Sequence, residues 1–177
     1  MKNLLPYRII SYLLLLVAAL LSIACIPLLI IGLFNIPLLL PVLICVCIVV
    51  YILSSFIFLV KTIDSRKEPK QKLLRIIKST SLVVLISSIT SVIQYLYILY
   101  NPSLVEAIIS QMLEFQKSMR ANAKNLDADL IRSTAKISIY IAIFFSTTLI
   151  IHVYETYKLI KQYLNAVNNN NQNTPLQ

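Results

Sequence analysis

The chain contains a single histidine, His152, and an acidic residue three positions later, Glu155. Residues three apart lie on one face of a helix, so an imidazole and a carboxylate at this spacing could bind a metal ion or move a proton. A metal site needs three or four ligands, and a proton path needs a series of ionisable groups. The surrounding apolar segment supplies neither. We therefore expect the pair to mark the polar end of a helix, with an enzyme site as the alternative.

Cys25, Cys45 and Cys47 also carry side chains that could react. All three fall within apolar segments, and the chain has no Cys-x-x-Cys spacing. This pattern predicts neither a disulfide framework nor a metal site. The chain has only one glycine, which excludes the glycine-rich loops that bind nucleotide phosphates. We expect no catalytic residues, cofactor or metal.

The elements that must position these side chains are membrane spans. The chain of 177 residues is 58% hydrophobic and only 13% charged, whereas a soluble domain carries about 25% charged residues. No Asp, Glu, Lys or Arg occurs between Arg8 and Lys61. This stretch is long enough for two spans of about 20 residues, and Asn35 and Pro37 supply a turn between them.

We therefore predict an all-α integral membrane protein with four transmembrane helices in two hairpins. The predicted helices are 9–33, 38–60, 79–100 and 137–154. The connections are an outer turn at 34–37, a basic cytoplasmic loop at 61–78 and an extracytoplasmic amphipathic segment at 101–136. Residues 1–8 form a cytoplasmic N-terminus, and the polar, Asn-rich tail at 155–177 is expected to be cytoplasmic and disordered.

The charges predict the orientation of the chain in the membrane. The 61–78 loop has seven basic and two acidic residues, which places it in the cytoplasm together with both termini. We expect the protein to lie in the cell (inner) membrane. The net charge of +9 then favours contact with anionic lipid on the cytoplasmic side. The loop has no aromatic residue, which argues against nucleic acid as a partner. The expected lipid contacts are Arg66, Lys67, Lys70, Lys72, Arg75 and Lys78.

The segment after the third span has the pattern of an amphipathic helix. Ser103 and Glu106 have the spacing of a capping box. Apolar residues then recur with a helical period, and they form a candidate interaction face: Leu104, Ile108, Met112, Phe115 and Met119. This face could lie on the outer lipid surface, pack on an extension of the fourth span that begins near Asp127, or bind a partner protein.

Polar residues also form stripes along the third and fourth spans. The candidate intramembrane stripe consists of Thr80, Ser87, Thr90, Ser91, Gln94, Thr148, His152 and Glu155. We expect both stripes to face the bundle interior, where hydroxyl groups bond across helices. His152 should then lie near the cytoplasmic end, beside Thr80 or Ser81, and Glu155 beside Lys158. Tyr7 is expected in an aromatic belt at the membrane surface.

The sequence favours a non-enzymatic multi-pass membrane protein that acts by association with a partner or with lipid. The expected partners are the bilayer and either another membrane protein or further copies of the chain. The alternative is a small oligomeric transporter or channel lined by the polar stripes of the third and fourth helices. A membrane enzyme that uses His152 and Glu155 is the third possibility.

Overall fold

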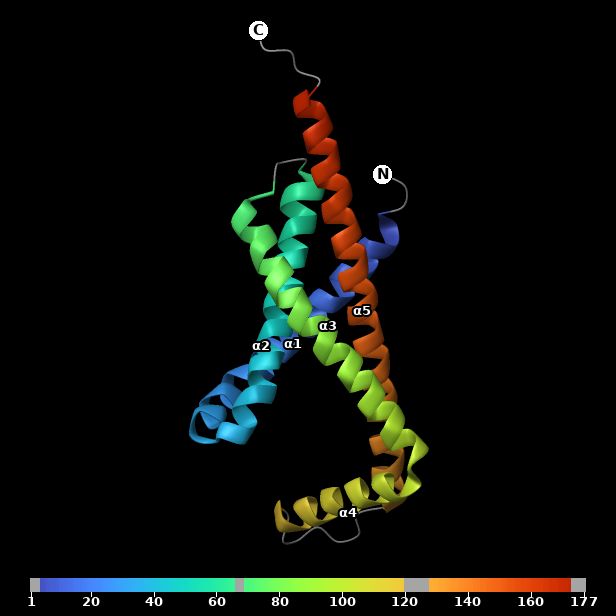
Figure 1. Cartoon of the computed structure of the whole chain (residues 1–177). Coiled ribbons are helices and arrows are strands. Elements are labelled where there is room, and N and C mark those ends of the chain that lie inside the picture. Colours follow the sequence, from blue (N-terminus) through green and yellow to red (C-terminus); the bar gives the residue numbers. More distant parts are fainter. Residues whose placement is uncertain (1–3, 66–68, 120–127, 173–177) are drawn as a thin grey trace. The chain divides into compact units, whose positions relative to one another are not determined.

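The computed structural model describes residues 4–65, 69–119 and 128–172. Every regular element in this part of the chain is a helix, which confirms the all-α prediction. The elements are α1 (Leu5–Phe34), α2 (Ile36–Phe58), the π-helix η1 (Leu59–Asp64), α3 (Gln71–Tyr100), α4 (Pro102–Met119) and α5 (Ala128–Gln172) (Figure 1).

Four helical segments are long and apolar enough to cross a membrane: Leu5–Phe34, Ile36–Asp64, Gln71–Tyr100 and Leu130–Asn165. The shortest has 29 residues. At about 1.5 Å per residue each exceeds the roughly 30 Å of a bilayer's hydrocarbon core. These helices are consistent with an integral membrane protein, and each continues beyond the range that hydrophobicity alone predicts.

Proline and asparagine residues determine several helix boundaries. Pro6 and Pro37 lie at the first positions of α1 and α2, where a missing N–H group costs no hydrogen bond. Between these helices only Asn35 leaves the helical conformation, with φ −136° and ψ 94°. The predicted outer turn at 34–37 is therefore a single residue.

The start of α4 also differs from the prediction. Asn101, rather than Ser103, precedes the helix, because the Asn101 carbonyl accepts hydrogen bonds from the N–H groups of Leu104 and Val105. Pro102 is then the first helical residue. Ser103 lies inside the first turn, so the predicted capping box does not form there.

Two segments that lie outside the predicted spans are largely helical. Within the predicted loop at 61–78, η1 runs to Asp64 and α3 begins at Gln71. The predicted disordered tail is helical through Gln172. Its first turns bury Thr156 and Leu159, and this packing stabilises a helix that composition alone did not predict. Asp127, the expected cap of this helix, lies outside the described residues.

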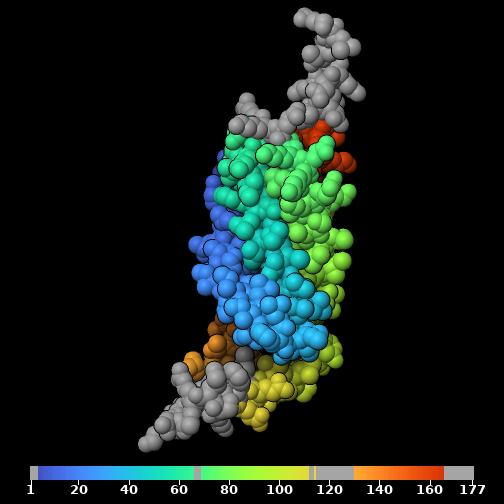
Figure 2. Space-filling view, turned by 90° about the vertical axis from the view of Figure 1, so that its left-hand side faces the viewer, coloured from blue at the N-terminus to red at the C-terminus, as the bar shows by residue number. Residues whose placement is uncertain are grey.

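Helices α1 and α2 pack side by side in opposite directions (Figures 1 and 2). Near the turn, a Cβ atom added to Gly32 would lie 3.6 Å from the Leu39 Cα. At the far end, the rings of Tyr12 and Phe56 meet edge to face, with their centroids 5.4 Å apart. Beyond them Arg8 forms an ion pair with Asp64 at the end of η1. The start of α1 and the end of η1 therefore lie together.

The chain divides into two compact units, Met1–Ser87 with Leu149–Gln177, and Ser88–Thr148. We call these the terminal unit and the central unit. The core of the terminal unit contains large buried side chains from several helices: Leu14, Tyr51, Ile52, Phe58, Leu59, Ile77, Leu149 and Val153. The central unit has a smaller cluster, formed by Val105, Ile109, Ile131 and Ala135 with Ile98 packed against it.

Candidate functional site

The predicted polar stripe on α3 is not the buried face of that helix. Thr90 and Gln94 are exposed, and Thr80, Ser87 and Ser91 are only half-buried. The buried positions are Ile77, Ser81, Val84 and Ser88, which are rotated by about one residue from the prediction. The hydroxyl groups of the predicted stripe do not require burial, because Thr80 donates to the Ile76 carbonyl at 2.7 Å and Ser87 to the Val84 carbonyl at 3.1 Å. A hydroxyl bonded to its own helix does not need to face other helices.

On α5, His152 and Glu155 do not act as a pair. Glu155 is half-buried, and its carboxylate lies 3.6 Å from the Lys158 ammonium group, as predicted. Thr148 donates its hydroxyl hydrogen to the Phe144 carbonyl at 2.8 Å. Only His152 among the predicted α5 residues is fully buried, with 1% of its surface exposed.

His152 also has different neighbours from those predicted. Its Nε2 atom lies 3.0 Å from the Ser11 hydroxyl of α1, and its Nδ1 atom lies 3.0 Å from the Tyr51 hydroxyl of α2. Ser81, one of its predicted neighbours, instead bonds the Tyr157 hydroxyl at 2.8 Å. The histidine therefore connects α5 to α1 and α2 through its ring, and not to α3.

Two further residues complete a buried cluster, which we call the His152 cluster: Tyr7, Ser11, Tyr51, His152 and Thr156. The hydroxyls of Tyr7 and Tyr51 each lie 3.2 Å from the Thr156 hydroxyl. The Tyr7 ring stacks on the imidazole, with centroids 5.0 Å apart and planes 6° from parallel. The Tyr51 ring meets the imidazole edge-on at 5.7 Å and 80°. Tyr7 is 4% exposed and so belongs to this cluster and not to the predicted aromatic belt.

The proton count of the cluster selects one tautomer of His152. Thr156 donates its hydroxyl hydrogen to the His152 carbonyl at 2.7 Å. Tyr7 and Tyr51 must therefore both donate to the Thr156 oxygen. Tyr51 then has no hydrogen left for Nδ1, so Nδ1–H donates to Tyr51 and Nε2 accepts from Ser11. With a neutral imidazole in this tautomer, each hydrogen bond of the cluster has one proton. The donors of these five bonds are Tyr7, Ser11, Tyr51, His152 and Thr156.

This geometry limits the chemistry available at the cluster. Both imidazole nitrogens already have partners, and no described buried side-chain nitrogen or oxygen lacks a hydrogen bond. Within the described residues, no group of three His, Cys, Asp or Glu side chains could hold a metal ion. A ligand for His152 would first have to displace Ser11 or Tyr51. The arrangement is suited to holding three helices together.

Sequence reasoning missed Ser11, Tyr51 and Thr156. A signal was present in two places, because Tyr7 and Ser11 are four residues apart, as are His152 and Thr156. Polar residues at this spacing share one helix face, so each pair presents a polar patch from an otherwise apolar span. The same spacing also marked Tyr51, because Ser54 and Ser55 follow it by three and four residues.

On α4, as on α3, the buried residues are shifted by one position from the predicted face. The side chains that pack are Val105 and Ile109, which contact Ile131 and Ala135 of α5. Beside them Arg132 forms an ion pair with Glu106 at 2.9 Å. Leu104 is exposed and Ile108 half-buried. The side chains of Met112, Phe115 and Met119 lie outside the described set.

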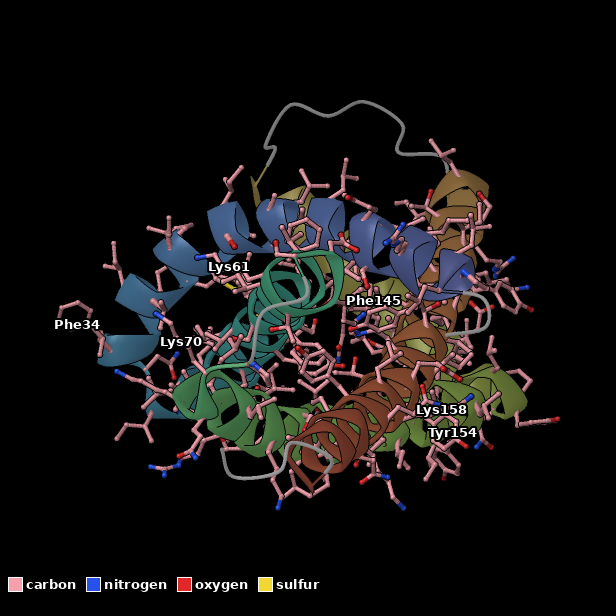
Figure 3. The ribbon with its side chains drawn as sticks, turned by 90° about the horizontal axis from the view of Figure 1, so that it is seen from above. Phe34, Lys61, Lys70, Phe145, Tyr154 and Lys158 are labelled. Carbon is pink, nitrogen blue, oxygen red and sulfur yellow. The ribbon has the colours of Figure 1, made fainter. Side chains whose placement is uncertain are left out.

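The predicted lipid contacts lie at the start of α3. Lys70, Lys72, Arg75 and Lys78 are all exposed, as is Lys61 in η1. Figure 3 labels Lys61 and Lys70. Arg66 and Lys67 lie outside the described residues. Arg8 and Lys158 each have a carboxylate partner, whereas none of these five basic residues forms an ion pair within the described part of the chain.

No match to the chain was found among protein-family models, curated proteins or solved structures. The structure supports the coarse description of an all-helical chain with four helices able to span a membrane.

Proposed function

We propose that the chain is a non-enzymatic integral membrane protein that acts by association, and that it holds anionic lipid at its cytoplasmic side. The observation that carries this proposal is the basic surface of Lys61, Lys70, Lys72, Arg75 and Lys78. All five side chains are exposed and lack an acidic partner among the described residues. Lipid phosphates would supply the missing negative charge.

The position of the basic surface supports this proposal. Lys78 is the last charged residue of α3, and the apolar part of that helix begins directly after it. The basic residues would therefore lie at the level of the lipid headgroups. Each contributes about 1 kcal/mol of attraction near an anionic surface, so five together would bind on the order of several kcal/mol more tightly than an uncharged surface.

The proposed topology follows from the same charges. The four spans would form two hairpins, α1 with α2 and α3 with α5, with both termini in the cytoplasm and α4 on the outer side. The positive-inside rule supports this orientation. The ion pair between Arg8 of α1 and Asp64 of η1 supports the first hairpin.

The His152 cluster supports a role without catalysis. Its hydrogen bonds connect side chains of α1, α2 and α5, so the lone histidine is used to hold these helices together. A general base needs a nitrogen that can reach a substrate, and each ring nitrogen of His152 already has a hydroxyl partner.

Lipid retention measured by native mass spectrometry tests the proposal. One variant replaces Lys70, Lys72, Arg75 and Lys78 by Gln. The matched control replaces Lys117, Arg120, Lys124 and Lys136 by Gln, which removes the same number of lysines and arginines from the predicted outer segment. The first variant should lose most of its bound anionic lipid and the control should keep it. Equal retention by the two variants would contradict the proposal.

Gln94 favours an oligomeric transporter or channel as a second candidate. Its amide is exposed on a spanning helix, and a polar amide in hydrocarbon is costly unless it is paired. A second copy of the chain could cover it and line a polar path. Replacing Gln94 by Leu should then dissociate the oligomer into single chains and abolish flux in reconstituted vesicles. An unchanged oligomer would count against this candidate.

A further inference from the structure

Two cysteine side chains from different helices meet inside the terminal unit. The Sγ atoms of Cys25 in α1 and Cys45 in α2 lie 2.6 Å apart. Both are free thiols. A disulfide has an S–S bond of about 2.05 Å, so a small movement of the side chains would bring these sulfurs to bonding distance. Cys47 is also a free thiol, and its sulfur has no hydrogen-bond partner among the described residues.

The two sulfurs differ in access. Cys25 is buried between the helices, and Cys45 is half-buried. Pro41, four residues before Cys45 and on the same face of α2, is exposed. On a spanning helix such a surface faces lipid. Cys45 can therefore be reached from the hydrocarbon layer, while Cys25 is placed to react with Cys45 from within the protein.

We propose that Cys25 and Cys45 form a reversible dithiol–disulfide site within the membrane, and that its oxidant is a lipid-soluble quinone. Two S–H bonds break and one S–S bond forms. The two electrons and two protons pass to the quinone, whose two carbonyl oxygens become hydroxyls. The oxidised site links α1 covalently to α2, and a dithiol reductant restores the two thiols.

The chemical class of the oxidant follows from the location of the thiols. Oxidants dissolved in water act mainly on thiolates, and an ionised sulfur is disfavoured in hydrocarbon. A quinone dissolves in the bilayer and takes up protons together with electrons, so no charge has to remain beside the sulfurs. This site does not depend on the proposed association with anionic lipid.

The test uses the full chain reconstituted in vesicles, with a short-tailed, fully substituted benzoquinone as the probe. When the ring substituents are all alkyl groups, a thiol can neither add at an open carbon nor displace an alkoxy group. With oxygen excluded, oxidation by the quinone is then the reaction that consumes thiols. After an acid quench and unfolding, the remaining thiols are alkylated and the peptides are mapped by mass spectrometry. Free thiols should fall from three to one per chain, with Cys25 joined to Cys45 and one quinol formed per link.

Single serine substitutions give the matched controls. Cys47→Ser should form the link and the quinol as the native chain does, whereas Cys25→Ser and Cys45→Ser should form neither. Treatment with dithiothreitol after unfolding should return the linked chain to its starting thiol count. The proposal is overturned if all three thiols survive the quinone, or if Cys47 enters links as often as Cys25 and Cys45.

Discussion

His152 is the residue whose chemical state the structure defines most closely. Because Thr156 uses its hydrogen on the His152 carbonyl, the remaining hydrogen bonds require a proton on Nδ1 and none on Nε2. The chain has one histidine, so histidine labelled with ¹⁵N gives one pair of ring signals that needs no assignment. We expect NMR to show a proton bonded to Nδ1 and an unprotonated Nε2. A proton on Nε2 would disprove this network.

Tyr51 is expected to stabilise the terminal unit, because its side chain is fully buried and its hydroxyl bonds both His152 and Thr156. Tyr51→Phe keeps the ring and leaves the Nδ1–H group without an acceptor. We expect a loss of about 1–3 kcal/mol in the free energy of unfolding, measured by unfolding in mixed micelles. The matched control is Tyr12→Phe, whose side chain is largely exposed. Equal losses in the two variants would contradict a structural role for the cluster.

At the scale of elements, a small apolar cluster and the Arg132–Glu106 ion pair hold α4 to α5 in the described part of the chain. Ile109 is 4% exposed in this cluster, whereas Leu104, on the same helix, is 37% exposed. Ile109→Ala should destabilise the contact by about 2–5 kcal/mol, the usual cost of such a core truncation. The amides of α4 should then exchange hydrogen faster in mass spectrometry. Leu104→Ala should leave the exchange rates nearly unchanged, and an equal effect of both changes would show that Ile109 does not anchor α4.

The sequence predicts the helices of this chain better than it predicts their buried faces. Long uncharged runs leave the backbone no alternative to helix, and Pro37 with Asn35 marks the break between α1 and α2. Buried faces are harder to predict because the spanning part of α3 carries hydroxyl residues on more than one side. Its hydroxyl residues bond their own helix, so Thr80 and Ser81 look alike in sequence although only Ser81 is buried. The role of Tyr51 was not predicted, because its partners His152 and Thr156 lie on α5, far away in the sequence.

At the scale of the whole molecule, the positive-inside rule predicts from the charges how the chain is oriented in the membrane, and this prediction can be tested. Ser65, at the end of η1, and Ser133, in the first turns of α5, are both exposed and suit a cysteine reporter. In a chain whose native cysteines are replaced by serine, Ser65→Cys should react with a membrane-impermeant maleimide only in inside-out vesicles. Ser133→Cys should react only in right-side-out vesicles.

The cause of this sidedness can be tested in the same assay. If the positive-inside rule sets the orientation, then replacing Lys70, Lys72, Arg75 and Lys78 by Gln before membrane insertion should allow part of the chains to insert the other way. Ser65→Cys would then be labelled in both kinds of vesicle. The equivalent replacement of Lys117, Arg120, Lys124 and Lys136 should strengthen the original orientation, because it removes the basic residues that oppose it. If neither set changes the labelling, the orientation is set by the apolar spans and not by these charges.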